Sequence, residues 1–205
     1  MITDAEKGIE IYDTAVNVSI TGNLLTGREG HAYSDDVTTF AVPDAGYLTS
    51  SGISYVQSGA SDDSKGHSIT GNSIRNFRKG IVLADSSNGG ACTGNVIGLC
   101  SSGIQFGANG AAMGADNNTI NHSRYVYSVE NTNYSAGLVG VNSASNCDEI
   151  VYFTGVGNYM LTMRGIKWYQ VTAAIVDASI TPVDLFLIPD AMNVTVNSLI
   201  TNLAT

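Results

Sequence analysis

Three aspartates, Asp13, Asp36 and Asp85, fall at one position of a repeated sequence pattern, five residues after its first residue. That first residue is glycine in two copies and His31 in a divergent one. If each copy is one turn of a stacked structure, Asp13 and Asp36 lie about 4.8 Å apart, and Asp36 and Asp85 about 10 Å apart. Retaining glycosidases hold their two carboxyl groups about 5 Å apart, and inverting enzymes roughly 6.5–9.5 Å apart. The like charge of a close pair would raise one pKa and favour a general acid. The three aspartates are therefore candidate catalytic residues.

An aspartate at the end of a strand can instead cap a turn by accepting hydrogen bonds from backbone amides two residues further on. The sequence leaves this alternative open. Glu10 and Tyr12 alternate outward on the strand before Asp13 and are candidate glycan-binding residues, the tyrosine by stacking on sugar rings. Asp62 and Asp63 lie in the Ser/Gly-rich segment 58–66, where they are either simply solvated or part of a loop that forms one wall of a groove.

The elements that must position these residues show a strict period. Asparagine precedes an aliphatic position at Asn72, Asn95 and Asn118, which are 23 residues apart, and again at Asn23. A second series, which begins with Gly-Ile at 8, 80 and 103, keeps an offset of 15 residues to the asparagines at 23, 95 and 118. The 49 residues between Asn23 and Asn72 fit one missing turn centred on 46–48. A fixed period of this size is typical of stacked repeats.

The local pattern predicts strands, because apolar residues alternate with period two in runs of four to five residues. Gly, Ser, Asn and Asp interrupt every run, and no segment before residue 150 has the spacing of a helix. We therefore predict an all-β fold, a right-handed parallel β-helix with about 23 residues per coil. The repeated asparagines are expected to stack amide on amide between coils, since neighbouring strands lie about 4.8 Å apart.

Composition limits the possible partners. The chain has 205 residues, 13 % of them charged, a net charge of −9 and a pI near 4.5. Nucleic-acid binding needs clustered basic residues, so no nucleic-acid partner is expected. The small basic group Arg75, Arg78 and Lys79 is expected to be a solvated edge, with an anion site as the alternative. The sequence contains no stretch of 18 apolar residues, so we predict no insertion into a membrane. The N-terminus shows no Sec signal.

The cysteines and histidines give no metal pattern. Cys92, Cys100 and Cys147 lie in apolar settings without a C-x-x-C spacing, and the three histidines fall at different phases of the repeat. Buried free thiols are expected, which suggests folding in a reducing compartment. We predict no metal and no cofactor.

The organisation changes around residue 150. The strand series continues once more at 150–153, 23 residues after Tyr127, and the phase is expected to be lost beyond it. Residues 159–205 contain longer apolar runs, Trp168 and two prolines. We therefore predict β-helix coils in residues 1–155 and a β-rich C-terminal segment in 156–205. This segment either caps the last coil or forms a subunit interface.

Together, the Asn-x-Ile coils, the free cysteines, the acidic charge and the distinct C-terminal segment resemble the distal part of a bacteriophage tailspike or tail fibre of the pectate-lyase-like β-helix type. The resemblance implies a homotrimer on the virion, assembled in the host cytoplasm, that acts extracellularly on a bacterial surface polysaccharide such as capsule or O-antigen. Tailspikes are commonly longer and carry an N-terminal virion-binding domain, so the resemblance implies a distal piece.

Three functions of different classes follow. The first is a tailspike segment that binds, and as a glycoside hydrolase depolymerises, the polysaccharide with paired carboxylates. The second is a non-catalytic structural or adhesive trimeric domain in which the aspartates cap turns. The third is a secreted polysaccharide lyase, which would need calcium-binding carboxylates and a Lys or Arg base on one face. The scarcity of lysine in the coils argues against the third, and the sequence does not decide between the first two.

Overall fold

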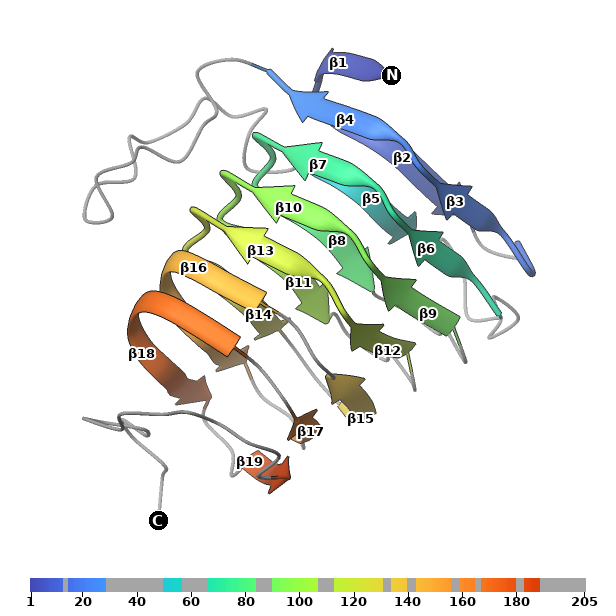
Figure 1. Ribbon diagram of the computed structural model, residues 1–205. Coiled ribbons are helices and arrows are strands. Elements are labelled where there is room, and N and C mark those ends of the chain that lie inside the picture. Colours follow the sequence, from blue (N-terminus) through green and yellow to red (C-terminus); the bar gives the residue numbers. More distant parts are fainter. Residues whose placement is uncertain are drawn as a thin grey trace.

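The computed structural model is an all-β solenoid in which parallel strands stack in successive coils (Figure 1). It describes the backbone of residues 1–12, 15–28, 50–56, 66–83, 90–106, 113–130, 134–139, 143–155, 159–164, 167–179 and 183–188. Side chains are described for 1–12, 15–28, 50–55, 66–83, 90–106, 114–129 and 143–152. Within these ranges there is no helix, and every strand pair is parallel. The predicted all-β fold, two parallel sheets stacked as in a parallel β-helix, is confirmed.

The strands form three columns. The first column contains β1 (Ile2–Ala5), β4 (Leu24–Gly27), β7 (Ser73–Arg75), β10 (Val96–Gly98) and β13 (Thr119–Asn121). The second contains β2 (Lys7–Tyr12), β5 (Ser51–Val56), β8 (Lys79–Leu83), β11 (Ser102–Phe106) and β14 (Tyr125–Glu130). The third contains β3 (Ser19–Thr21), β6 (Ser68–Thr70), β9 (Gly90–Thr93), β12 (Met113–Asp116), β15 (Tyr134–Val139), β17 (Tyr159–Arg164) and β19 (Val183–Ile188). Two long strands, β16 (Ser143–Gly155) and β18 (Lys167–Ser179), continue both of the first two columns.

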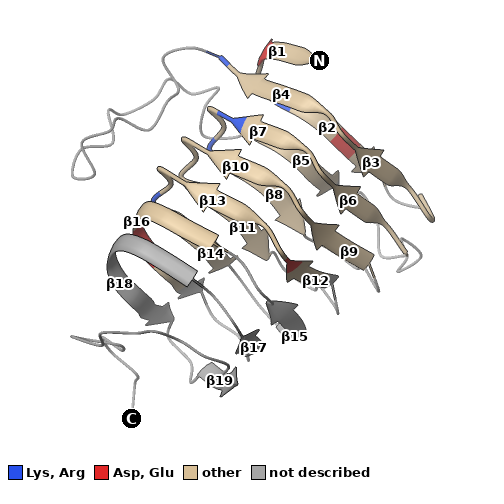
Figure 2. Ribbon diagram, viewed as in Figure 1, with Lys and Arg blue, Asp and Glu red and all other residues tan. Residues whose placement is uncertain are grey.

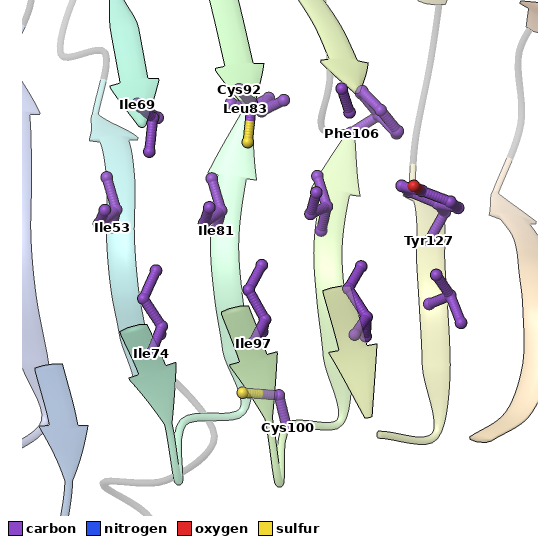
Figure 3. Close-up of a cluster of buried hydrophobic side chains, with 14 of the residues drawn as sticks. Ile53, Ile69, Ile74, Ile81, Leu83, Cys92, Ile97, Cys100, Phe106 and Tyr127 are labelled. Carbon is purple, nitrogen blue, oxygen red and sulfur yellow. The ribbon is translucent and has the colours of Figure 1, made fainter. Parts of the chain in front are cut away.

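Each coil uses one strand of each column, and equivalent residues of successive coils pair directly. Ile74 pairs with Ile97, and Ile97 pairs with Ile120. All three side chains are buried, and Figure 3 shows Ile74 and Ile97 in a row beside Ile53 and Ile81 of the second column. The aliphatic rows of the sequence are thus the core of the solenoid, and the predicted period is the step from one coil to the next.

The glycines that begin the Gly-Ile strands face this core. A Cβ on Gly80 would lie 2.6 Å from Ile97 Cγ2 and 2.5 Å from the carbonyl oxygen of Gly103, which is closer than real Cβ atoms approach. A Cβ on Gly103 would lie 2.8 Å from Ile120 Cγ2. Glycine therefore occurs here because the isoleucine of the following coil fills the space that a side chain would need.

The repeated asparagines form a hydrogen-bonded ladder. Asn95 Oδ1 accepts from both the backbone N and Nδ2 of Asn72, each at 3.0 Å, and Asn118 Oδ1 accepts from the same two atoms of Asn95 at the same distances. The Nδ2 of Asn95 also donates to the carbonyl of Ile69. Since these three side chains are almost wholly buried, their amides satisfy backbone groups of the turn that water cannot reach. The predicted amide stack is confirmed.

The prediction of a missing turn between Asn23 and Asn72 is wrong. Leu24 of β4 pairs directly with Ser73 of β7, and Asn72 Oδ1 accepts a hydrogen bond from the backbone N of Asn23 at 2.9 Å. The two asparagines therefore belong to adjacent coils. The extra residues fall mainly in the part of the sequence after the end of β4 and before the start of β5.

The phase does not end near residue 153, contrary to the prediction. Tyr127 pairs with Val151, so the step here is 24 residues and the predicted alignment with Ile150 is one residue off. The same step continues where Val151 pairs with Ile175, and β17 pairs with β19 in the third column. Parallel stacking thus extends through 183–188. Capping and subunit contact by residues 156–205 remain predictions, as does the handedness.

The three cysteines are free and buried, as predicted. Burial away from water raises the pKa of Cys92 and Cys100 to about 12 and that of Cys147 to about 11. The thiols are therefore protonated near neutral pH and act as small core residues rather than as nucleophiles.

Candidate functional site

The predicted catalytic residues Asp13, Asp36 and Asp85 and the loop residues Asp62 and Asp63 all lie outside the described residues. The strands before two of them are described. The strand β2 precedes Asp13, β8 precedes Asp85, and both pair with β5 from opposite sides. The two strand ends are therefore two steps apart, about 10 Å. The strand β5 has β2 and β8 as its neighbours, so β2 and β5 are adjacent. The predicted one-coil step from Asp13 to Asp36 concerns residues outside the described ranges and stays a prediction.

Glu10 and Tyr12 lie in the described part of the chain. In the first coil, Glu10 forms an ion pair with Lys7 and accepts a hydrogen bond from Tyr12. Lys7 Nζ lies 2.7 Å from Glu10 Oε1, and the hydroxyl of Tyr12 donates to Glu10 Oε2 at 2.9 Å. These contacts, led by the hydrogen bond from Lys7, lower the pKa of Glu10. Glu10 is thus an ionised carboxylate with both oxygens engaged, which does not suit a general acid. Tyr12 is 55 % exposed and remains available to a ligand.

In the following coils the outward positions of the second column are buried, and most of them are polar. Ser54 aligns with Glu10, and the same row continues through Val82, Gln105 and Ser128, each at most 8 % exposed. Ser102 and Ser128 share a hydrogen bond of 2.7 Å. This row is therefore packed within the chain rather than open to solvent, and the accessible chemistry of the column lies toward its ends.

At the fifth and sixth coils this column carries an aromatic pair. The rings of Tyr125 and Tyr152 stack with 4.3 Å between centroids and an interplanar angle of 9°. The guanidinium of Arg124 lies 4.9 Å from the centroid of the Tyr125 ring, a cation–π contact. Tyr152 is partly exposed, so the stack presents an aromatic surface to solvent on the outward face of β14 and β16.

Two carboxylates lie beside this stack because of the strand register. Glu149 pairs with Tyr125, and the backbone N–H groups of Asp148 and Glu149 both donate to the carbonyl of Arg124, at 3.1 and 2.9 Å. One oxygen of Glu149, Oε2, is buried and has no hydrogen-bond partner. Burial raises the pKa of Glu149 to about 7; the Arg124 charge opposes that rise and the Asp148 charge adds to it.

We define the residues Arg124, Tyr125, Asp148, Glu149 and Tyr152 as the tyrosine–carboxyl cluster. A carboxyl group that titrates near neutral pH can accept or donate a proton under physiological conditions, and perturbed carboxyl groups of this kind gather at functional sites. The adjacent aromatic stack offers the apolar surface that sugar rings use. The cluster is the strongest candidate site among the described residues.

The repeat pattern did not predict this cluster, since its assembly depends on the change from a 23- to a 24-residue step. With the 23-residue step, Glu149 would align with Val126 instead of Tyr125. The only available hint was local: Arg124 comes directly before β14, and Asp148 and Glu149 place two charges within β16, just before its apolar run 150–153. No group of three or more metal-ligating side chains occurs in the described part of the chain.

Comparisons with family models, with curated proteins and with solved structures gave no match for this chain. Among the described residues, no helix has the length and apolar character needed to cross a membrane.

Proposed function

We propose that this chain is a receptor-binding segment of the bacteriophage tailspike type that binds a bacterial surface polysaccharide through the outward face of its second strand column. The observation that carries the proposal is the tyrosine–carboxyl cluster, where stacked rings adjoin a half-buried glutamate. Aromatic faces pack against the apolar faces of sugar rings, while carboxyl groups hydrogen-bond to sugar hydroxyls. A solenoid suits a polymeric ligand because its columns repeat every 4.8 Å or so.

In this proposal the protein is part of a phage tail, is assembled in the host cytoplasm and acts outside the cell. Residues 156–205 contribute to a homotrimer, because their strand sequences are long, apolar and poor in charge. The solenoid end at the first coil carries Tyr12 and the Lys7–Glu10 pair, a second place where sugar can contact the same column.

Cleavage of the glycan would require a general acid, and Glu149 has the pKa for that role. A second carboxylate at the separation typical of glycosidases would complete the pair. The candidate for it among the described residues is Asp148 beside Glu149. Asp13 and Asp85 follow strands that lie five and three steps from β16, so with Asp36 they form a separate group predicted from the sequence. The proposed reaction is thus glycoside hydrolysis.

A second candidate function is a non-catalytic adhesive or structural domain. The observation that favours it is the state of Glu10, which Lys7 and Tyr12 hold as an ionised carboxylate, together with the burial of the serine and glutamine row between the two ends of the column. An enzyme groove would be expected to leave more of this row accessible.

Incubation with capsule and O-antigen from candidate hosts, followed by sizing of the products and by a binding measurement, tests these proposals. We expect the wild-type chain to bind one glycan, and Glu149→Gln to abolish any shortening of the polymer while the protein stays folded. Asp13→Asn and Asp36→Asn test the other carboxylates, and Asp4→Asn, an exposed carboxylate in the first column, is the matched control. Binding without shortening would establish the adhesive alternative, and absence of binding to every glycan would contradict the proposed function.

Sedimentation of the purified chain tests the trimer. A monomer at micromolar concentration would contradict the interface role of residues 156–205 without affecting glycan binding by the cluster.

A further inference from the structure

One corner of the solenoid, where the first column turns into the second, collects basic side chains. Arg75 ends β7, Arg78 and Lys79 follow in the turn and the start of β8, and Arg124 lies in the equivalent turn before β14. We call these four residues the basic corner. Figure 2 shows blue positions following this edge through the coils. The chain has nine Lys and Arg against 18 Asp and Glu, so four cations on one corner depart from its overall acidity.

The strand register aligns these cations along the solenoid axis. Lys79 pairs with Ser102, and Ser102 pairs with Tyr125. The residues just before them, Arg78, Ser101 and Arg124, therefore occupy one row, which the hydrogen bond from Ser102 N to the Arg78 carbonyl supports. Arg78 and Arg124 are two steps apart along this row, about 10 Å.

Arg75 and Arg124 of the corner contrast with Arg28 and Lys7, which face carboxylates. Arg28 lies 3.5 Å from Asp4 and 3.6 Å from Glu6, and Lys7 is paired with Glu10. Arg75 is exposed and forms no ion pair within the described ranges. Arg124 is exposed as well, with its guanidinium over the Tyr125 ring. The positive potential of the corner is therefore directed to solvent rather than neutralised at these two side chains.

The row of cations ends at the sixth coil. The next residue in the row after Arg124 is Asp148, followed along the chain by Glu149. An anionic ligand on the corner would therefore lie over the third to fifth coils, and its end would meet the tyrosine–carboxyl cluster. Arg124 belongs to both groups and connects the corner to the proposed glycan site.

We infer that the basic corner binds the anionic groups of an acidic polysaccharide, one whose carboxylate, sulfate or phosphate substituents recur at about the spacing of Arg78 and Arg124. The inference rests on the proposed function and specifies its ligand as an acidic glycan. A nucleic acid fits the site less well, because its dense phosphates need more cations than four and would approach Asp148 and Glu149. Exposed charge pairs contribute about 0.2–1 kcal/mol each, so binding is expected to be weak per contact and sensitive to salt.

The test compares binding of the full chain to alginate, an acidic polysaccharide, and to neutral dextran at low and moderate salt. We expect binding to alginate that weakens as salt rises, and little binding to dextran. The double variant Arg75→Gln/Arg124→Gln should lose about tenfold in affinity, since two exposed contacts together account for about 1.4 kcal/mol. Arg28→Gln is the matched control, because this arginine faces Asp4 at 3.5 Å and Glu6 at 3.6 Å, lies outside the basic corner and should leave affinity unchanged.

Unfolding curves of each variant establish that the proteins remain folded. Equal affinity of wild type and double variant for alginate, or equal binding of alginate and dextran, would overturn the inference while leaving polysaccharide binding intact. Binding of duplex DNA as tight as that of alginate, with the same dependence on Arg75 and Arg124, would overturn the choice of a glycan. Absence of binding to both polysaccharides would overturn the inference, and the capsule and O-antigen experiment would still decide the proposed function.

Discussion

Val126 and Ala144 are a larger and a smaller side chain at the two core positions where Gly103 and Ile120 stand one coil earlier, so the order of sizes is reversed. Val126 follows Tyr125, which pairs with Ser102, so it occupies the place held by Gly103 one coil earlier. Ala144 pairs with Ile120 and occupies its place one coil later. Both residues are buried in the same core. The combined side-chain volume at these two core positions is therefore similar from coil to coil. Gly103 is combined with Ile120 in one case, and Val126 with Ala144 in the next.

This relationship predicts that Gly103 and Ile120 are energetically coupled. Gly103→Ala places a Cβ 2.8 Å from Ile120 Cγ2 and should destabilise the protein by about 1–3 kcal/mol. Ile120→Ala alone leaves a cavity and should cost about 2–5 kcal/mol. The double variant should cost at least about 1 kcal/mol less than the sum, because the new methyl group enters the space that isoleucine vacates. Free energies of unfolding from urea titration measure the coupling.

Part of the cost of Gly103→Ala will remain in the double variant, since the same Cβ approaches the carbonyl oxygen of Val126 at 2.9 Å. If the losses in unfolding free energy of Gly103→Ala and Ile120→Ala simply add in the double variant, the two positions do not compensate each other in volume.

The asparagine ladder predicts a graded effect of position. Asn95→Ala removes the acceptor of two N–H groups of Asn72, and it removes the Nδ2 donor to Asn118 Oδ1 and to the carbonyl of Ile69, all in buried surroundings. We expect a loss of about 3 kcal/mol or more, because each buried unsatisfied group costs about 1–3 kcal/mol. Asn23→Ala is the matched control at the half-buried end of the ladder and should cost about 1 kcal/mol. Similar losses in urea unfolding for both variants would contradict a ladder that depends on burial.

Glu149 predicts a pH dependence of stability with a definite sign. Its folded pKa of about 7 lies above the usual carboxyl value of 4.5, so the folded state holds the extra proton between these two values. The free energy of unfolding should therefore fall as the pH rises from about 4.5 to about 7. Glu149→Gln should remove this component and be more stable than wild type at pH 8. Unfolding midpoints measured from pH 5 to 8 test both statements.

His67 must be separated from this effect, because burial lowers its pKa and its contribution has the opposite sign. Its Nδ1 accepts the backbone N–H of Val18 at 3.2 Å, an interaction that protonation would remove. Stability due to His67 is lost as the pH falls below about 6.5. Both proteins share this component, so the difference between wild type and Glu149→Gln isolates Glu149. A difference that stays constant with pH would contradict the raised pKa.

Local chemistry made most of the fold predictable. The alternation of apolar residues, the glycines before isoleucine and the asparagines at 72, 95 and 118 each require a specific local structure, and all three agree on one period. The candidate site was less predictable, because a site formed between coils depends on register. One extra residue per coil moves Glu149 into line with Tyr125.

The sequence by itself determined that the chain forms parallel strands, stacks them coil on coil, and buries isoleucine, asparagine and cysteine between them. These features follow from side-chain periodicity and from the hydrogen-bonding needs of buried backbone. Only the tertiary structure decided that Asn23 and Asn72 are neighbours, that the stack continues beyond residue 155, and that Glu149 lies half-buried near Arg124 and Tyr125. The reason is that a long connection adds little closure entropy and leaves no periodic trace, while a pKa depends on neighbours that only the completed register supplies.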